Sequence, residues 1–164
     1  MNRHQRRKEE KKQNRNLNFQ NLLLNAIDLH SKKQFKEAEK IYMRLIVSDP
    51  NNYDVQRHLG ILFQDQGKYE KAYNFYLKAI DSKANGFEAI SNLGTIHLVN
   101  KNSDLAMKCF EKALSINPKY IPAINNLSGL HHRLGDSKLS LKYAKLALSL
   151  QPDNILTKNQ ILIF

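Results

Sequence analysis

The sequence contains few residues that make turns or crosslinks. Among 164 residues there are six glycines, four prolines, one cysteine and no tryptophan. So few turn-forming residues disfavour a loop-rich β-sandwich and favour helices. The single cysteine, Cys109, excludes an internal disulfide and a cysteine-based zinc site. Uninterrupted apolar runs reach only about four residues, against the roughly 20 that a membrane-spanning helix needs. No apolar segment follows the basic N-terminus, as it would in a secretory signal. We therefore expect a cytoplasmic protein with no transmembrane segment.

Acidic residues are also scarce, and the positive charge is unevenly placed. The chain has 26 basic and 15 acidic residues, a net charge of +11. Residues 1–16 contain only two acidic residues, and their seven basic residues are Arg3, Arg6, Arg7, Lys8, Lys11, Lys12 and Arg15. No apolar residue lies between Asn2 and Asn16. Because such a segment buries too little surface to offset its ordering entropy, we expect a disordered tail or a frayed helix over 1–16.

Two interpretations of this tail stay open. Its charge can attract nucleic acid, an anionic membrane surface or another anionic partner. Alternatively, it is a solvated leader that aids solubility. The tail contains no aromatic residue, which argues against stacking on bases.

An internal repeat with a constant period of 34 residues dominates the rest of the chain. The recurring positions hold small residues (Ala38, Ala72, Ala106, Ser140), then large ones (Tyr42, Tyr76, Phe110, with Ala144 last), and a unit-closing series (Pro50, Ala84, Pro118, Pro152). In a fourth series, Leu followed by a small residue recurs as Leu59-Gly60, Leu93-Gly94 and Leu127-Ser128. A period between 20 and 50 residues is typical of stacked repeats. Within each unit, apolar residues follow helical spacing twice, so each unit is predicted to be two helices.

The small residues have a packing explanation. Gly60 and Gly94 lie inside predicted helices, where glycine costs about 1 kcal/mol relative to alanine. This cost is explained if a neighbouring helix approaches closely there. We expect the small residues Ala72, Ala79, Ala106 and Ala113 to face the glycines, with Tyr42, Tyr76 and Phe110 filling the larger gap beside them.

A unit with Leu-Gly in its first helix, Ala followed by Tyr or Phe in its second, and a closing Pro resembles the tetratricopeptide repeat (TPR). Four units match, at about 19–52, 53–86, 87–120 and 121–154. The resemblance implies an all-α fold: a right-handed solenoid of four antiparallel helix hairpins over 17–154. Residues 155–164 would then be a short stub helix, either a partial fifth repeat or a cap. Unit 1 departs from the pattern with Asn25-Ala26, unit 2 with Ala84, and unit 4 with Ala144, which predicts looser packing of its second helix.

The resemblance also implies where a partner binds. In TPR proteins the first helices of the hairpins line a concave face that holds extended peptides or partner helices. The repeat register places these candidates there: Arg57, His58, Gln64, Ser91, Asn92, Thr95, Asn125, Asn126, His132 and Arg133. They do not form the Lys/Arg/Asn clamp of chaperone-binding members. Asn92 and Asn126 do match the asparagine ladder of O-linked N-acetylglucosamine transferases, whereas Leu24 and His58 do not. The two asparagines are either peptide-binding amides or part of a solvated helix face.

No set of residues predicts catalysis or a cofactor. His97 and His131 hold the same repeat position, so they are expected roughly 10 Å apart, too far to share a metal ion. Lys108 and Lys112 near Cys109 could lower its pKa, but a packing cysteine is the simpler interpretation. We therefore expect a non-enzymatic adaptor or scaffold.

Two alternatives concern the whole chain. The resemblance implies one of them, because bacterial TPR proteins often carry a transferase domain after the array: the chain could be the substrate-recruiting N-terminal fragment of a larger bacterial transferase resembling a glycosyltransferase. The abundant Lys and Asn separately fit a bacterial genome rich in A and T. The apolar end Ile161–Phe164 either folds back over unit 4 or leads into further sequence.

Overall fold

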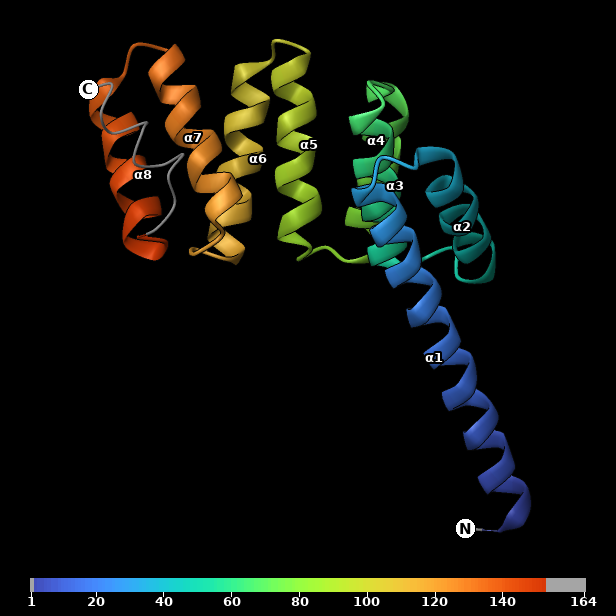
Figure 1. Cartoon of the computed structure of the whole chain (residues 1–164). Coiled ribbons are helices and arrows are strands. Elements are labelled where there is room, and N and C mark those ends of the chain that lie inside the picture. The colour runs from blue at the N-terminus through green and yellow to red at the C-terminus, as the bar shows by residue number, and fades with distance from the viewer. Residues whose placement is uncertain (1, 153–164) are drawn as a thin grey trace. The chain divides into compact units, whose positions relative to one another are not determined.

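The computed structural model describes residues 2–152, which form eight helices and no strand (Figure 1). The helices are α1 (Arg3–Ser31), α2 (Phe35–Ser48), α3 (Tyr53–Asp65), α4 (Tyr69–Ser82), α5 (Phe87–Val99), α6 (Ser103–Ile116), α7 (Ile121–Arg133) and α8 (Ser137–Leu150). They pair in sequence order into the hairpins α1–α2, α3–α4, α5–α6 and α7–α8. The predicted all-α array of helical hairpins is thereby confirmed. The predicted stub helix at 155–164 lies outside the described residues.

The hairpins group into two compact units, residues 1–82 and 83–164. In the N-terminal unit α3 packs against both α1 and α2. In the C-terminal unit α7 packs against both α5 and α6 in the same way. The first helices of the two hairpins are therefore neighbours within each unit. We call the surface that α1 and α3, or α5 and α7, present together the A-helix face of that unit.

A glycine facing an aromatic ring fixes the close approach of the helices in the two middle hairpins. Tyr76 and Phe110 are fully buried. A Cβ atom at Gly94 would lie 2.7 Å from Phe110 Cε1, and one at Gly60 would overlap the ring of Tyr76. Only a residue without a side chain fits at either place, so the close approach predicted at the two glycines is confirmed. The prediction that alanines face the glycines was wrong, because the aromatic rings themselves lie against them.

The fourth hairpin closes the same gap with hydroxyl groups. Ser128 stands where the two middle hairpins have glycine, and Ala144 stands where the other three hairpins have an aromatic ring. The Ser128 hydroxyl donates to the carbonyl oxygen of Ser140, and the Ser140 hydroxyl donates to the carbonyl oxygen of Ser128, both over 2.9 Å. Both serines are 1% exposed. Two small polar groups thus occupy room that a ring fills elsewhere, and their hydrogen bonds remain satisfied.

The turn inside every hairpin repeats one backbone conformation. Lys33, Gly67, Lys101 and Gly135 hold the same position in successive repeats, and their φ angles are 59°, 72°, 60° and 80°. This left-handed conformation ends the first helix and is easy for glycine but strained for lysine.

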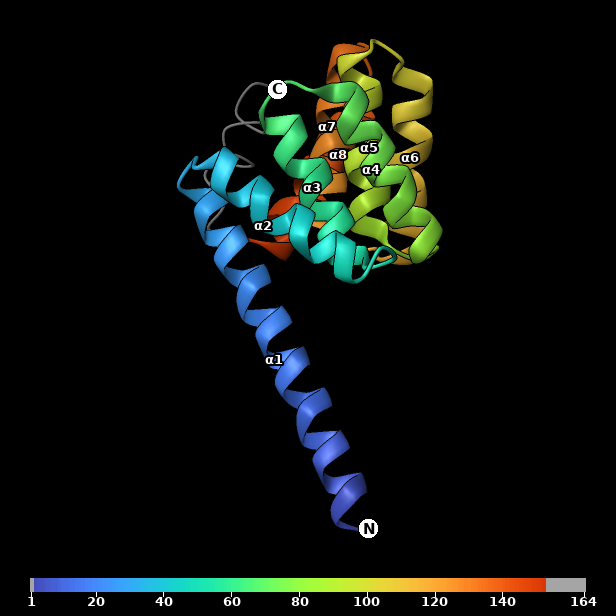
Figure 2. The same ribbon diagram turned by 90° about the vertical axis from the view of Figure 1, so that its right-hand side faces the viewer.

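Helix α1 differs from the sequence expectation at its N-terminus. A disordered tail or a frayed helix was expected over 1–16, but residues 3–16 continue α1 and project away from α2, α3 and α4 (Figures 1 and 2). All side chains from 2 to 18 are exposed, so the cause is local. The segment has no glycine or proline and is rich in Arg, Lys, Gln and Glu, which favour helices. Asn2 and Gln5 also form a capping box, each side chain accepting from the other's backbone N–H over 2.9 Å.

None of the described helices combines the length and the apolar character needed to cross a bilayer. Helix α1, with 29 residues, is long enough but far too polar.

Candidate functional site

A groove of about 600 Å³ opens on the A-helix face of the N-terminal unit. Its lining residues come from α1, α3, the α1–α2 turn and the start of α2, and include Ile27 and Ile61, one from each first helix. The remaining lining residues are His30, Ser31, Lys33, Phe35, His58 and Asp65. The groove therefore combines apolar side chains with several hydrogen-bonding groups, as sites for short peptide segments do.

An ion pair connects the two first helices at one end of this groove. His30 Nε2 lies 2.9 Å from Asp65 Oδ2. The His30 ring is also packed edge-on against Phe35 and Tyr42. Sequence reasoning missed this pair. The sequence did contain a signal for it: His30 and Asp65 are separated by one repeat plus one position. This spacing places the two side chains on neighbouring first helices.

His58 lies between the two hairpins, with its ring stacked on Tyr42 at 6.0 Å and 7°. Burial, together with the smaller effects of the charges of Arg57 and His30, lowers the pKa of His58 to about 3. Arg57 Nη2 lies 3.0 Å from His58 Nε2. A guanidinium can only donate, so Nε2 accepts and the imidazole is neutral. His58 can therefore present a polar edge to a ligand without carrying charge.

Two buried polar atoms beside His58 have no hydrogen-bond partner in the described residues. They are the Tyr42 hydroxyl oxygen and Arg57 Nε. Burial also raises the pKa of Tyr42, so its hydroxyl stays protonated. Arg57 reaches Asp54 only at 3.7 Å. Unsatisfied buried polar groups cost about 1–3 kcal/mol each, and neither residue lines the groove, so this cost is set by the packing inside the unit.

Gln64, another predicted contact residue, forms a hydrogen bond within the hairpin. The Tyr76 hydroxyl donates to Gln64 Oε1 over 2.9 Å, which ties α3 to α4.

In the C-terminal unit, the predicted contact residues differ in how exposed their side chains are. Asn92, Thr95, Asn125 and Asn126 are half-buried on α5 and α7, and the side-chain oxygen of Asn125 has no hydrogen-bond partner among the described residues. His132 and Arg133 are exposed at the end of α7.

Ser91 requires a correction. It was predicted to contact a partner, but it is only 1% exposed. The repeat register assigns it to the A-helix face, yet so short a side chain lies beneath its larger neighbours and cannot reach a ligand.

Histidine and cysteine side chains in this unit have packing roles. His131 is stacked on Tyr143, with ring centroids 5.6 Å apart. Burial raises the pKa of the half-buried Cys109 thiol, and the charge of Lys112 only partly opposes this. The described residues contain no cluster of His, Cys, Asp and Glu suited to a metal ion.

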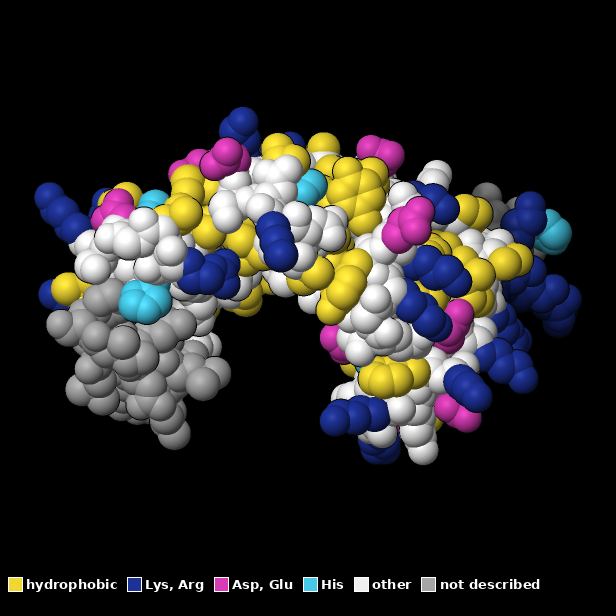
Figure 3. Space-filling view, turned by 90° about the horizontal axis from the view of Figure 1, so that it is seen from above, with side chains coloured by type: hydrophobic (Ala, Val, Ile, Leu, Met, Phe, Trp, Pro, Cys, Tyr) yellow, Lys and Arg dark blue, Asp and Glu magenta, His cyan; other side chains and the backbone are white. Residues whose placement is uncertain are grey.

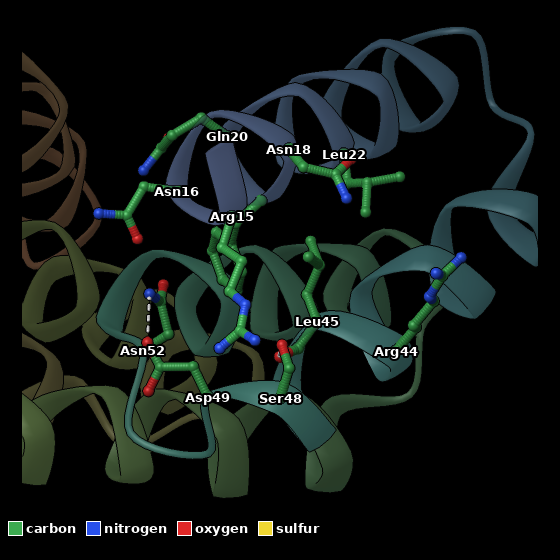
Figure 4. Close-up of a pocket in the computed structure, with 11 residues that line it drawn as sticks. Arg15, Asn16, Asn18, Gln20, Leu22, Arg44, Leu45, Ser48, Asp49 and Asn52 are labelled. Atoms are coloured by element: carbon green, nitrogen blue, oxygen red, sulfur yellow. Dashed lines mark hydrogen bonds between the residues drawn. The ribbon is translucent and has the colours of Figure 1, made fainter. Parts of the chain in front are cut away.

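A second hollow, of about 730 Å³, lies where α1 leaves the body of the N-terminal unit (Figure 4). Arg15 points from α1 toward Asp49 and Ser48 at the end of α2, and Arg44 lies at the side. Among the tail residues predicted to meet an anionic partner, Arg15 is thus the one next to the body of the unit.

Helix hairpins that recur at a constant spacing, in which a small residue of the first helix lets the second approach closely, define a helical-repeat protein. Tetratricopeptide repeat models match residues 58–83, 87–120 and 121–154, together more than half of the sequence. The chain belongs to the tetratricopeptide repeat family. No curated protein matches the sequence significantly.

Solved structures with the same fold are distant in sequence. The crystal structure of MamA is 21% identical, covers 84% of this chain and 81% of its own, and has a TM-score of 0.70. PilF of Pseudomonas aeruginosa is 16% identical, with coverages of 90% and 68% and a TM-score of 0.82. The first TPR of Spaghetti (RPAP3), bound to the HSP90 peptide SRMEEVD, is 22% identical, with coverages of 68% and 88% and a TM-score of 0.64. At these identities the similarity shows the fold alone.

Proposed function

We propose that this protein is a non-enzymatic interaction module that binds an extended peptide or a partner helix on the A-helix face of the N-terminal unit. The carrying observation is the groove lined by Ile27 and Ile61, because it places apolar surface beside the hydrogen-bonding side chains of His30, Ser31 and His58. Peptide recognition needs both: apolar side chains enter a pocket while the backbone finds donors and acceptors.

The comparisons support the general role. TPR repeats form interaction surfaces from stacked hairpins. Among the solved structures with this fold, one is described as bound to the HSP90 peptide, and another, YrrB, as having an unusual peptide-binding site. The asparagines at positions 92 and 126 offer the C-terminal unit a more polar surface of the same kind.

The test is selection of peptides from a displayed random library on the immobilised full chain, followed by affinity measurements in solution. Ile61→Glu places a charge in the groove and is expected to weaken the selected peptides at least about tenfold, the effect of about 1.4 kcal/mol. Val47→Glu is the control, because Val47 is 78% exposed on α2. Equal affinity for wild type and Ile61→Glu would contradict the proposal. Loss of binding only in an Asn92→Ala, Asn126→Ala variant would contradict it too, by assigning the site to the C-terminal unit.

A further inference from the structure

One face of α1 changes character along its length. Phe19, Leu22 and Ala26 are half-buried or buried on the side that packs against the N-terminal unit. Lys12 precedes Phe19 by seven residues, and Arg15 precedes Leu22 by seven. Residues seven apart lie on the same side of a helix, since 3.6 residues make one turn. The packing side of α1 therefore continues upstream as a mainly basic stripe, which also contains Asn16 and Glu9, seven and fourteen residues before the buried Leu23.

No other described element covers this basic stripe. All side chains from Asn2 to Asn18 are exposed, and the segment projects beyond α2, α3 and α4 (Figures 1 and 2). In the view of Figure 3, Lys and Arg side chains lie over the surface of the N-terminal unit, with acidic side chains among them. At the root of the segment, Arg15 and Arg44 line the hollow described above, where Asp49 is the acidic neighbour.

The chemistry of the segment decides which class of partner fits. A second copy of this chain is disfavoured, because each copy carries a net charge of +11. A membrane surface is disfavoured because no side of the helix between Asn2 and Asn16 carries an apolar residue, whereas interfacial helices bury an apolar face. An acidic protein is disfavoured because protein interfaces depend on apolar and aromatic anchors. Nucleic acid needs none of these, since phosphates supply most of its contacts.

We propose that residues 3–16 of α1 bind double-stranded DNA through its phosphates, with the helix lying in the major groove. An α-helix with its side chains is about 10–12 Å across, and the major groove of B-DNA is about 12 Å wide. The exposed segment is roughly 20 Å long at 1.5 Å per residue. The deep, narrow major groove of double-stranded RNA does not admit side chains, and single strands are held on aromatic platforms that this segment lacks.

The first test is fluorescence anisotropy of a labelled DNA duplex of 24 base pairs with the full chain, between 50 and 200 mM salt. In one variant Lys8, Lys11 and Lys12 become Gln. In the matched control three exposed lysines of the C-terminal unit, Lys108, Lys138 and Lys145, become Gln, with the same loss of charge. The α1 variant is expected to bind at least about tenfold more weakly, and its log–log salt slope to fall by about 2–3, because each phosphate contact contributes about 0.9. The control is expected to keep the wild-type slope. Equal losses in both variants would overturn the proposal.

The second test asks whether the helix itself matters. Asn14→Pro keeps every charge but breaks the exposed helix without touching a packed residue, and Asn14→Ala is its control. The proline variant is expected to lose DNA affinity at least about threefold, whereas the alanine variant keeps it. Unchanged binding by Asn14→Pro would overturn insertion into the groove. Equal competition by poly-glutamate or by duplex RNA of matched charge would overturn the choice of DNA, as would tighter binding to phosphatidylserine vesicles. Ile61→Glu should bind DNA like wild type, so this proposal and the peptide proposal fail separately.

Discussion

The two units of this protein place different chemistry at equivalent positions. In the N-terminal unit, Tyr42 is stacked on His58, and the Tyr76 hydroxyl donates to Gln64. In the C-terminal unit, two repeats further on, Phe110 replaces Tyr42 and Asn126 replaces His58. The N-terminal unit thus buries titratable and hydroxyl-bearing side chains where the C-terminal unit has a hydrocarbon ring and an amide.

This contrast shows which properties the repeat constrains. Tyr42, Tyr76 and Phe110 are all 0% exposed, so their shared size and position are what packing requires. Their polar atoms are not required, because Phe110 has none and the Tyr42 hydroxyl has no partner within the described residues. Stability in the two units should therefore respond similarly to changes of volume and differently to pH and to the loss of hydroxyl groups.

The largest effect is expected from removing a ring. Phe110→Ala should lower the free energy of unfolding by about 3–5 kcal/mol, because it leaves a cavity against Gly94. Urea denaturation followed by circular dichroism measures the change, and Leu105→Ala, at 41% exposure, is the control. Adding Gly94→Ala to Phe110→Ala should cost nothing further, because the new methyl group enters the vacated space. An additive loss in that double variant would contradict the glycine–ring explanation.

The next effect separates the units by pH. His58 has a pKa of about 3 in the folded protein, against about 6.5 when unfolded. Below about pH 6.5 the unfolded chain gains a proton that folded His58 does not accept. The free energy of unfolding should therefore fall as the pH decreases from about 6.5 toward 3.

His58→Asn, which copies Asn126 of the C-terminal unit, should remove this part of the pH dependence, and Asn126→Ala should leave it intact. Urea denaturation at several pH values between 7.5 and 4 measures both. Identical pH profiles for wild type and His58→Asn would show that His58 is not the group responsible.

A smaller difference should distinguish the two tyrosines. Tyr76→Phe removes the hydrogen bond to Gln64 and should cost about 1 kcal/mol. Tyr42→Phe removes a buried hydroxyl without a partner and should be neutral or stabilising by up to about 1 kcal/mol. Thermal and urea denaturation of the two variants measure the difference in their free energies of unfolding. An equal loss of stability in both variants would contradict this prediction.

The smallest effect is expected in the turns. Lys101→Gly should stabilise the protein by about 0.5–1 kcal/mol, because φ is 60° at this position and lysine is strained there. Gly135→Lys should destabilise by a similar amount, since its φ is 80°. The midpoints of urea denaturation measure both changes in stability. A loss of stability in Lys101→Gly would show that Lys101 is not strained.

The constant repeat period was sufficient to predict the hairpins and the buried aromatic positions. Helix starts have similarly local causes: Asn102 and Asp136 cap α6 and α8 by accepting from the backbone N–H groups of Leu105 and Leu139. These features depend on local chemistry and on spacing, both of which a sequence displays directly.

Other features could not be read from the pattern. The helical course of residues 3–16 arises from propensity and capping, which a rule based on apolar burial ignores. The burial of Ser91 depends on the length of its neighbours' side chains rather than on register. The two hydrogen bonds between Ser128 and Ser140 could not be predicted from the repeat pattern. The sequence indicated only that this hairpin differs twice from the pattern, with Ser in place of Gly in one helix and Ala in place of the aromatic residue in the other.

The recurring left-handed residue has a practical consequence for labelling this protein. Turns within hairpins tie one helix to the next through that strained residue, so an added amino acid would rotate one helix against its partner and misalign the ring and the glycine. The exposed links between hairpins, at Asn51 and Lys119, bear no such constraint. A fluorescent or affinity tag inserted there should leave the array folded, whereas the same tag at Lys33 or Lys101 should not.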